Sequence, residues 1–217
     1  MLSIKSFTFG LFQTNTYVVS DEQGNVLLID PACYTEDEKQ QLLNYVDSQI
    51  VNRPSSNRPL TIVATHGHLD HLWGAAWASK QWNMPVYIPA ADIPMAEKMQ
   101  LKYNMFDIPL TAEPFPIEPL QSAMTNHQSL LSNFQLLSTP GHTPGSVSIY
   151  IPEEKTLFSG DTLFRMGFGR TDLPGGNYYQ LIQSLKTLFQ LPPDTKVFPG
   201  HGEPTTIGRE SGHSPYL

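Results

Sequence analysis

The residues best suited to chemistry are the imidazoles and carboxylates of one short run, HGHLDH, at residues 66–71. Residues two apart in an extended segment point to the same side, so His66 and His68 can bind one metal ion. Asp70 and His71 are neighbours at the start of a predicted helix, so they diverge from that pair and suit a second ion. Imidazole and carboxylate donors without a thiolate favour Zn²⁺, Mn²⁺ or iron.

Three more candidate ligands, His142, Asp161 and His201, each follow a glycine later in the chain. The two histidines can add a third nitrogen to each ion, and Asp161 can bridge both ions with its two oxygens. Two ions held this way would generate a bridging hydroxide at neutral pH. Clustered histidines and acids are typical of metal sites, so the pattern favours a two-metal centre over isolated structural histidines.

These candidates must be positioned by the elements that precede them, and each follows a short apolar segment. The alternation of apolar residues predicts strands at 2–9, 15–20, 26–29, 60–65, 86–88, 134–138, 146–151, 156–159 and 195–198. Apolar stripes and capping signals predict helices at 35–50, from about 70 to 82, at 92–105 and at 177–190. Hairpins followed by alternating helices and strands, in two successive halves, favour helices covering two stacked sheets. With no separating linker, we expect a single domain over residues 1–217.

Two segments allow alternative interpretations. Asp30, directly after a predicted strand, can orient a ligand histidine or can simply be a turn residue before Pro31. The Met- and Pro-rich segment 91–126 is predicted to be irregular after its helix, and it can form a lid over substrate or fill gaps in the core.

Composition excludes several classes of function. Lys and Arg number 13 against 20 Asp and Glu, a net charge of −7, which argues against binding a nucleic-acid backbone. We find no apolar run long enough to span a membrane and no signal-peptide pattern. The one cysteine, Cys33, fits a reducing compartment, so we expect a cytoplasmic protein. Its thiol can lie near the site or be an inert packed group.

Five motifs then reveal a resemblance. They are Ile29-Asp30, Thr65 to His71, Gly141 to Gly145, Gly160 to Phe164 and Pro199 to Gly202. In this order they resemble the metallo-β-lactamase superfamily. The resemblance implies an α/β fold, a four-layer αβ/βα sandwich with two divalent metals, for which zinc is expected and iron or manganese are alternatives. It assigns His66, His68 and His142 to the first metal, Asp70, His71 and His201 to the second, and Asp161 to both.

The stretches 160–165, 169–172 and 199–208 resemble the glyoxalase II-like hydrolases more specifically. This implies hydrolysis of a small-molecule thioester, such as a 2-hydroxyacyl-glutathione, with Asp70 also orienting the nucleophile. The glutathione-binding helical domain of those enzymes is not expected here, which puts glutathione in doubt. Arg170 stands where they carry a lysine, so it can contact substrate or can pair with Asp172 on the surface.

Other reactions remain open on the same fold. A persulfide dioxygenase with a single iron resembles the chain in its Gly169 to Asp172 stretch, and a lactone hydrolase is a further alternative. Lactamases of this fold commonly carry Cys at position 161 or Arg at position 71. The chain has neither, which argues against a lactamase.

Overall fold

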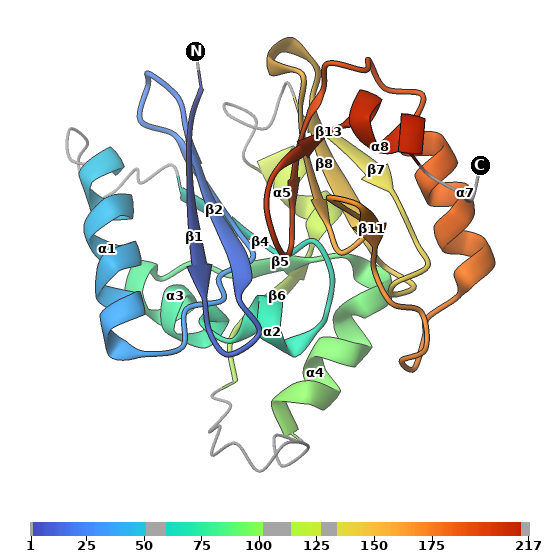
Figure 1. The fold of residues 1–217 in the computed structure, drawn as a ribbon. Coiled ribbons are helices and arrows are strands. Elements are labelled where there is room, and N and C mark those ends of the chain that lie inside the picture. The colour runs from blue at the N-terminus through green and yellow to red at the C-terminus, as the bar shows by residue number, and fades with distance from the viewer. Residues whose placement is uncertain (1, 51–59, 102–113, 127–133, 214–217) are drawn as a thin grey trace. The chain divides into compact units, whose positions relative to one another are not determined.

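The structure, a computed structural model, describes residues 2–50, 60–101, 114–126 and 134–213. They belong to two compact units, Met1–Ser132 and Asn133–Leu217. In Figure 1 the first unit runs from blue to green and the second from yellow to red. Among the described helices, none is both long enough and apolar enough to cross a bilayer.

The first unit is built on a six-stranded sheet whose spatial order follows the chain. Its strands are β1 (Ser3–Phe9), β2 (Thr14–Ser20), β3 (Val26–Ile29), β4 (Leu60–Val63), β5 (Val86–Ile88) and β6 (Ile117–Pro119). The first three strands pair antiparallel, as the predicted hairpins require, and β3 to β6 pair parallel. Parallel strands end at the same edge of a sheet, so the residues that follow β3 and β4 come together there.

Helices connect these strands. They are α1 (Glu36–Ile50), α2 (Leu69–Leu72), α3 (Ala75–Trp82), the 3₁₀ turn η2 (Ala90–Asp92), α4 (Ile93–Leu101) and α5 (Leu120–Asn126). The predicted capping box begins α1: the Glu38 N–H donates to Thr35 Oγ1 at 3.2 Å, and the Thr35 N–H donates to Glu38 Oε2 at 2.9 Å. Leu42 and Val46 of this helix are fully buried in the core of the unit.

The prediction for segment 91–126 was wrong in part. After α4 the chain does not stay irregular, because β6 adds a parallel strand beside β5 and α5 follows it. Pro119, the last residue of β6, is tolerated because β6 is an edge strand, which pairs with a neighbour on one side only. Residues 102–113, including the end of the predicted helix 92–105, lie outside the described residues, so the lid interpretation stays a prediction.

The second unit carries a five-stranded sheet in the order β13-β12-β9-β8-β7 and a separate hairpin, β10-β11. The sheet strands are β7 (Gln135–Ser138), β8 (Val147–Ile151), β9 (Thr156–Gly160), β12 (Lys196–Pro199) and β13 (Thr205–Thr206). The hairpin is β10 (Leu163–Phe164) with β11 (Gly167–Phe168), and the helices are η4 (Pro152–Glu154), α7 (Tyr178–Leu188) and α8 (Ile207–His213). The amphipathic α7 buries Leu181, Leu185 and Leu188 against the sheet core. The sequence analysis predicted α7 and all of these sheet strands except β13, and it missed β10, β11 and α8.

Candidate metal centre

In the first unit the candidate ligands lie at the ends of β3 and β4. The Asp30 N–H donates to the Val63 carbonyl at 2.9 Å, so the pairing of the two strands continues one residue beyond β3. Asp30 has a left-handed backbone, with φ of 52°, which turns the chain away from the sheet. Its carboxylate therefore lies beside the loop that joins β4 to α2 and carries the histidines.

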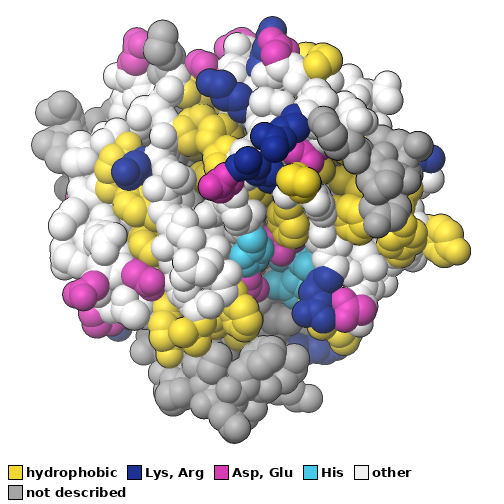
Figure 2. Space-filling model, viewed as in Figure 1, with side chains coloured by type: hydrophobic (Ala, Val, Ile, Leu, Met, Phe, Trp, Pro, Cys, Tyr) yellow, Lys and Arg dark blue, Asp and Glu magenta, His cyan; other side chains and the backbone are white. Residues whose placement is uncertain are grey.

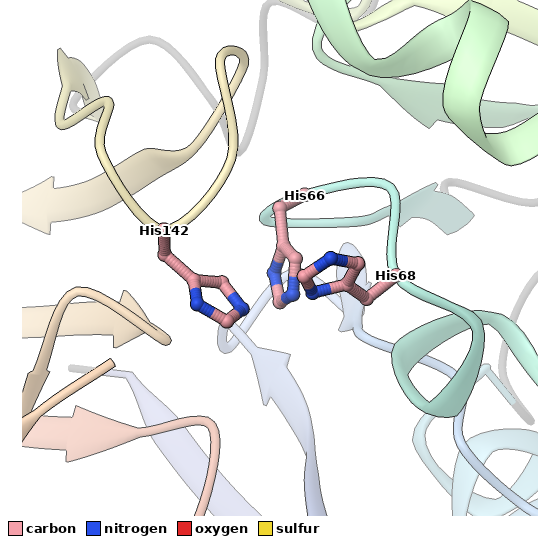
Figure 3. Close-up of side chains that lie close together, drawn as sticks. All are labelled: His66, His68 and His142. Carbon is pink, nitrogen blue, oxygen red and sulfur yellow. The ribbon is translucent and has the colours of Figure 1, made fainter. Parts of the chain in front are cut away.

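Three imidazoles, two from that loop and one from α2, form a buried cluster. His66, His68 and His71 have only 1%, 7% and 0% of their surface exposed. The ring centroid of His66 lies 4.9 Å from that of His68 and 4.1 Å from that of His71. Figure 3 shows the first two rings side by side, each from the loop that follows β4. Burying three polar rings together is costly unless their nitrogens bind something, and a metal ion is the usual partner.

Asp30 holds the imidazole of His71 in one orientation. Its Oδ2 accepts from His71 Nδ1 at 2.9 Å and from the Thr65 hydroxyl at 2.8 Å, and its Oδ1 accepts from the Thr65 N–H at 2.7 Å. A carboxylate only accepts, so Nδ1 of His71 carries the proton and Nε2 presents a lone pair. Asp30 thus does more than end a turn, because it fixes the tautomer that a metal-binding histidine needs.

The sequence analysis did not single out Asp92, which lies against the same loop. This fully buried carboxylate accepts from the Gly67 N–H at 2.9 Å. Gly67 stands in the sequence between the candidate ligands His66 and His68. A Cβ on Gly67 would come within 2.9 Å of both Cβ and the carbonyl oxygen of Asp92, so only glycine fits. The contact joins residues 25 apart that share no recognisable motif, and nothing in the sequence pattern indicates it.

In the second unit, Asp161 lies between two imidazoles. Its Oδ2 is 3.4 Å from His142 Nε2 and 3.5 Å from His201 Nε2. Asp161 follows β9 and His201 follows β12, and these strands are parallel neighbours that end at one edge. His142 comes from the turn between β7 and β8. Asp161 Oδ2 therefore has an imidazole nitrogen within 3.5 Å on each of two sides.

The backbone of the second unit fixes the tautomer of His142. Its Nδ1 donates to the carbonyl of Arg170 at 2.7 Å, which leaves Nε2 with a lone pair toward Asp161. Gly169 makes this approach possible, since a Cβ there would overlap the Asp161 carbonyl oxygen and lie 3.1 Å from His142 Nδ1. The sequence analysis missed this role of the Arg170 carbonyl, because backbone atoms leave no trace in residue types.

The same donor arrangement occurs in both units. Nε2 of His71 lies 3.6 Å from Asp70 Oδ2, much as His142 Nε2 lies 3.4 Å from Asp161 Oδ2. These separations are long for a hydrogen bond. They match two donors that share one ion, because bonds of about 2.1 Å at a tetrahedral angle place the donors about 3.4 Å apart. The residues present therefore fit divalent metal ions.

Each predicted ligand belongs to a candidate metal-binding group among the described residues. Four of these ligands are in the first unit and three in the second. Among the described residues, the groups consist of His66, His68, Asp70, His71, His142, Asp161 and His201. Figure 3 draws three of these histidines.

The side chain of Arg170 is bound to an acid in the structure. Its Nε and terminal nitrogen donate to the two carboxylate oxygens of Asp172 at 2.8 and 2.6 Å. This exposed pair lowers the pKa of Asp172 to about 2, chiefly through the hydrogen bonds. Figure 2 shows the same mixture of charges on one face of the molecule, where dark blue and magenta side chains lie beside each other. The surface-pairing interpretation of Arg170 thus describes its contacts, and contact with substrate stays a prediction.

Cys33 is a packed thiol. It is fully buried in the core of the first unit, and burial raises its pKa to about 12. Of the two interpretations for this residue, the structure favours the inert one.

A fold of two α/β units with buried imidazoles and carboxylates at strand ends is typical of one class of metal-dependent enzymes. The chain matches the Metallo-beta-lactamase superfamily over residues 9–201, and it belongs to this family. It is therefore a metal-binding hydrolase of that superfamily, and the predicted metallo-β-lactamase fold class is confirmed.

The chain is similar to several particular members of this superfamily. The chain is 29% identical to the hydroxyacylglutathione hydrolase GloC of Haemophilus influenzae, covering 100% of this chain and 98% of GloC. It is similar to TTHA1623 in a di-iron-bound form, with 38% identity, a TM-score of 0.81 and coverage of 98% and 100% of the two chains. It is also similar to BLEG-1, a B3 metallo-beta-lactamase, with 32% identity, a TM-score of 0.75 and 99% coverage of both chains.

Proposed function

We propose that this protein hydrolyses a small-molecule thioester with the help of two divalent metal ions. His66, His68 and His142 would hold the first ion and Asp70, His71 and His201 the second, with Asp161 shared. The observation that carries the proposal is the arrangement common to both units, an imidazole with its Nδ1 fixed by an acceptor and its Nε2 3.4–3.6 Å from a carboxylate oxygen.

The metal is proposed to be zinc or iron, with manganese as a further alternative. The donor set suits all three ions because it offers imidazole and carboxylate but no thiolate. The di-iron form of TTHA1623 supports iron and a centre of two ions.

The chain's own residues prepare this chemistry in the proposed reaction. When bound, the ions would lower the pKa of a shared water and polarise the substrate carbonyl. Asp70 would orient the attacking water, while Asp30 and the Arg170 carbonyl keep the lone pairs of His71 and His142 directed at the ions. Water adds to the thioester carbonyl, the carbon–sulfur bond breaks, and the products are a carboxylic acid and a thiol. Thiolate leaves readily, so no strong general acid is needed.

The substrate class rests on the resemblance to glyoxalase II-like enzymes and on the similarity to GloC, a hydroxyacylglutathione hydrolase. A 2-hydroxyacyl thioester is the favoured substrate. Thiols other than glutathione are included as carriers, because the helical domain that binds glutathione in glyoxalase II is not expected here. The predicted cytoplasmic location and the absence of nucleic-acid or membrane partners belong to the same proposal.

The test combines metal analysis of the purified protein with a panel of thioesters of glutathione, coenzyme A and other thiols. About two ions per chain and hydrolysis of at least one thioester are expected. Asp161→Ala should lose both metal and turnover, whereas Thr156→Val, which removes a buried hydroxyl bonded only to a backbone carbonyl, should keep them. One iron per chain with oxygen uptake would favour the persulfide dioxygenase instead. Preferential cleavage of lactones would favour a lactone hydrolase, and preferential cleavage of β-lactams would favour a β-lactamase.

A further inference from the structure

The hydroxyl of Thr14 lies on a proposed metal ligand from a distant part of the chain. Thr14 is the first residue of β2 and is completely buried. Its Oγ1 donates to Asp70 Oδ2 at 3.1 Å, across 56 residues of sequence. Neither the sequence motifs nor the proposed ligand set includes this threonine.

The accepting oxygen is the one that faces the metal-binding nitrogen of the neighbouring histidine. Asp70 Oδ2 lies 3.6 Å from His71 Nε2, so Oδ2 is the oxygen that the second ion would take. A carboxylate oxygen has more than one lone pair, so it can accept from the hydroxyl and still bind a cation. The Asp70 side chain is about 20% exposed, and it can rotate toward solvent if nothing restrains it.

We propose that Thr14 is a positioning residue that holds the Asp70 carboxylate in its metal-binding orientation. This inference rests on the proposed function, since it assumes that Asp70 binds the second ion. Outer hydrogen bonds of this kind orient metal ligands, and their loss typically costs about 10- to 100-fold in metal affinity.

The hairpin that carries Thr14 is itself held in place, so the hydroxyl is delivered by a rigid element. Thr14 pairs with Phe9 at the end of the β1–β2 ladder. In the turn, the Gln13 N–H donates to the Gly10 carbonyl at 3.3 Å, and the Gly10 N–H donates to Glu38 Oε1 of α1 at 3.0 Å. These contacts hold the Thr14 hairpin in place without involving Asp70 of α2.

The experiment compares Thr14→Val, which has nearly the same shape but no donor, with Thr14→Ser, which keeps the donor. Thr8→Val is the matched control, because it removes a side-chain hydrogen bond of the same hairpin, to Asn15 at 2.9 Å, without touching a ligand. Zn²⁺ affinity for each of the two sites is measured by competition with a chromogenic chelator. Co²⁺ absorption spectra report the ligand geometry independently of turnover.

We expect Thr14→Val to bind the second Zn²⁺ about 10- to 100-fold more weakly and the first ion with unchanged affinity. Thr14→Ser and Thr8→Val should match the wild type in both steps. Should the valine variant not fold, Thr14→Ala against Thr14→Ser makes the same comparison. If Thr14→Val binds both ions within twofold of the wild-type affinity, the inference about Thr14 is overturned and the proposed function still stands. A wild-type protein that binds fewer than two ions would instead overturn the proposed function, and this inference with it.

Discussion

Replacing Asp30 by Asn is the most informative single change in the first unit. Asn has nearly the same volume, and it tolerates the left-handed backbone, φ of 52°, that Asp30 adopts. The substitution therefore removes a charge and an acceptor with little added backbone strain. The hydrogen bond from the Thr65 N–H to Oδ1 can survive, because the amide retains one oxygen.

The acceptor that the substitution removes is Oδ2, which accepts from His71 Nδ1 in the wild type. In the variant an amide NH₂ faces the Nδ1–H of His71, so two donors meet where an acceptor was. A hydrogen bond to a charged group contributes about 1.5–3 kcal/mol, and we expect the metal-free variant to be less stable by about 2–3 kcal/mol. His71 can relieve the conflict by moving its proton to Nε2, which removes the lone pair that a metal requires. Metal affinity should therefore fall by at least the tenfold that is usual for such partners.

Three measurements check this prediction. Urea unfolding of the metal-free protein gives the loss of stability, chelator competition gives the affinity, and ¹⁵N chemical shifts of the imidazole report which nitrogen of His71 carries the proton. Asp47→Asn is the control, because Asp47 accepts from Trp82 Nε1 at 3.0 Å in the same unit without contacting a histidine. Equal urea midpoints and equal metal affinities for Asp30→Asn and wild type would refute the reasoning.

Three further predictions follow from the second unit and from the core. Gly169→Ala should lower the free energy of unfolding by about 1–3 kcal/mol and reduce the metal content, because a Cβ there would overlap the carbonyl oxygen of Asp161. Gly167→Ala is the control, since a Cβ there would meet nothing within 4 Å, and it should behave as wild type in the same assays. Arg170→Ala should raise the pKa of Asp172 from about 2 toward its ordinary value of 3.8, as NMR titration can show. Because the pairing lowers that pKa, its stabilising effect is present above pH 3.8 and lost as the pH falls toward 2; an unchanged titration would contradict the ion pair. Cys33 should resist iodoacetamide at pH 8 until the protein is unfolded, because its pKa is about 12, and rapid labelling of folded protein would show that the thiol is accessible.

Much of the fold could be predicted because its signals are local. The capping box of Thr35 and Glu38 and the apolar stripe of α7 each lie within one element, and both occur where the sequence indicated. The missed strand β6 depends on a distant partner. Strand β6 is only three residues long, and it exists because β5 offers a free edge to pair with. A three-residue segment with a proline has no periodicity of its own to reveal it.

The sequence by itself determined which side chains are available for metal binding. The spacing of the residues in the 66–71 run and the glycines before His142, Asp161 and His201 indicate a donor set without thiolates, and residue types alone decide that chemistry. These residues also follow apolar strands, so their place at strand ends could be inferred.

Only the tertiary structure decided how those donors are oriented. The tautomer of His71 depends on Asp30, that of His142 on the Arg170 carbonyl, and the orientation of Asp70 on the Thr14 hydroxyl. Each contact joins residues 28 to 56 positions apart. Hydrogen bonds act over about 3 Å, and the register and packing of the sheets bring such distant residues within that range, so no spacing in the chain could have revealed them.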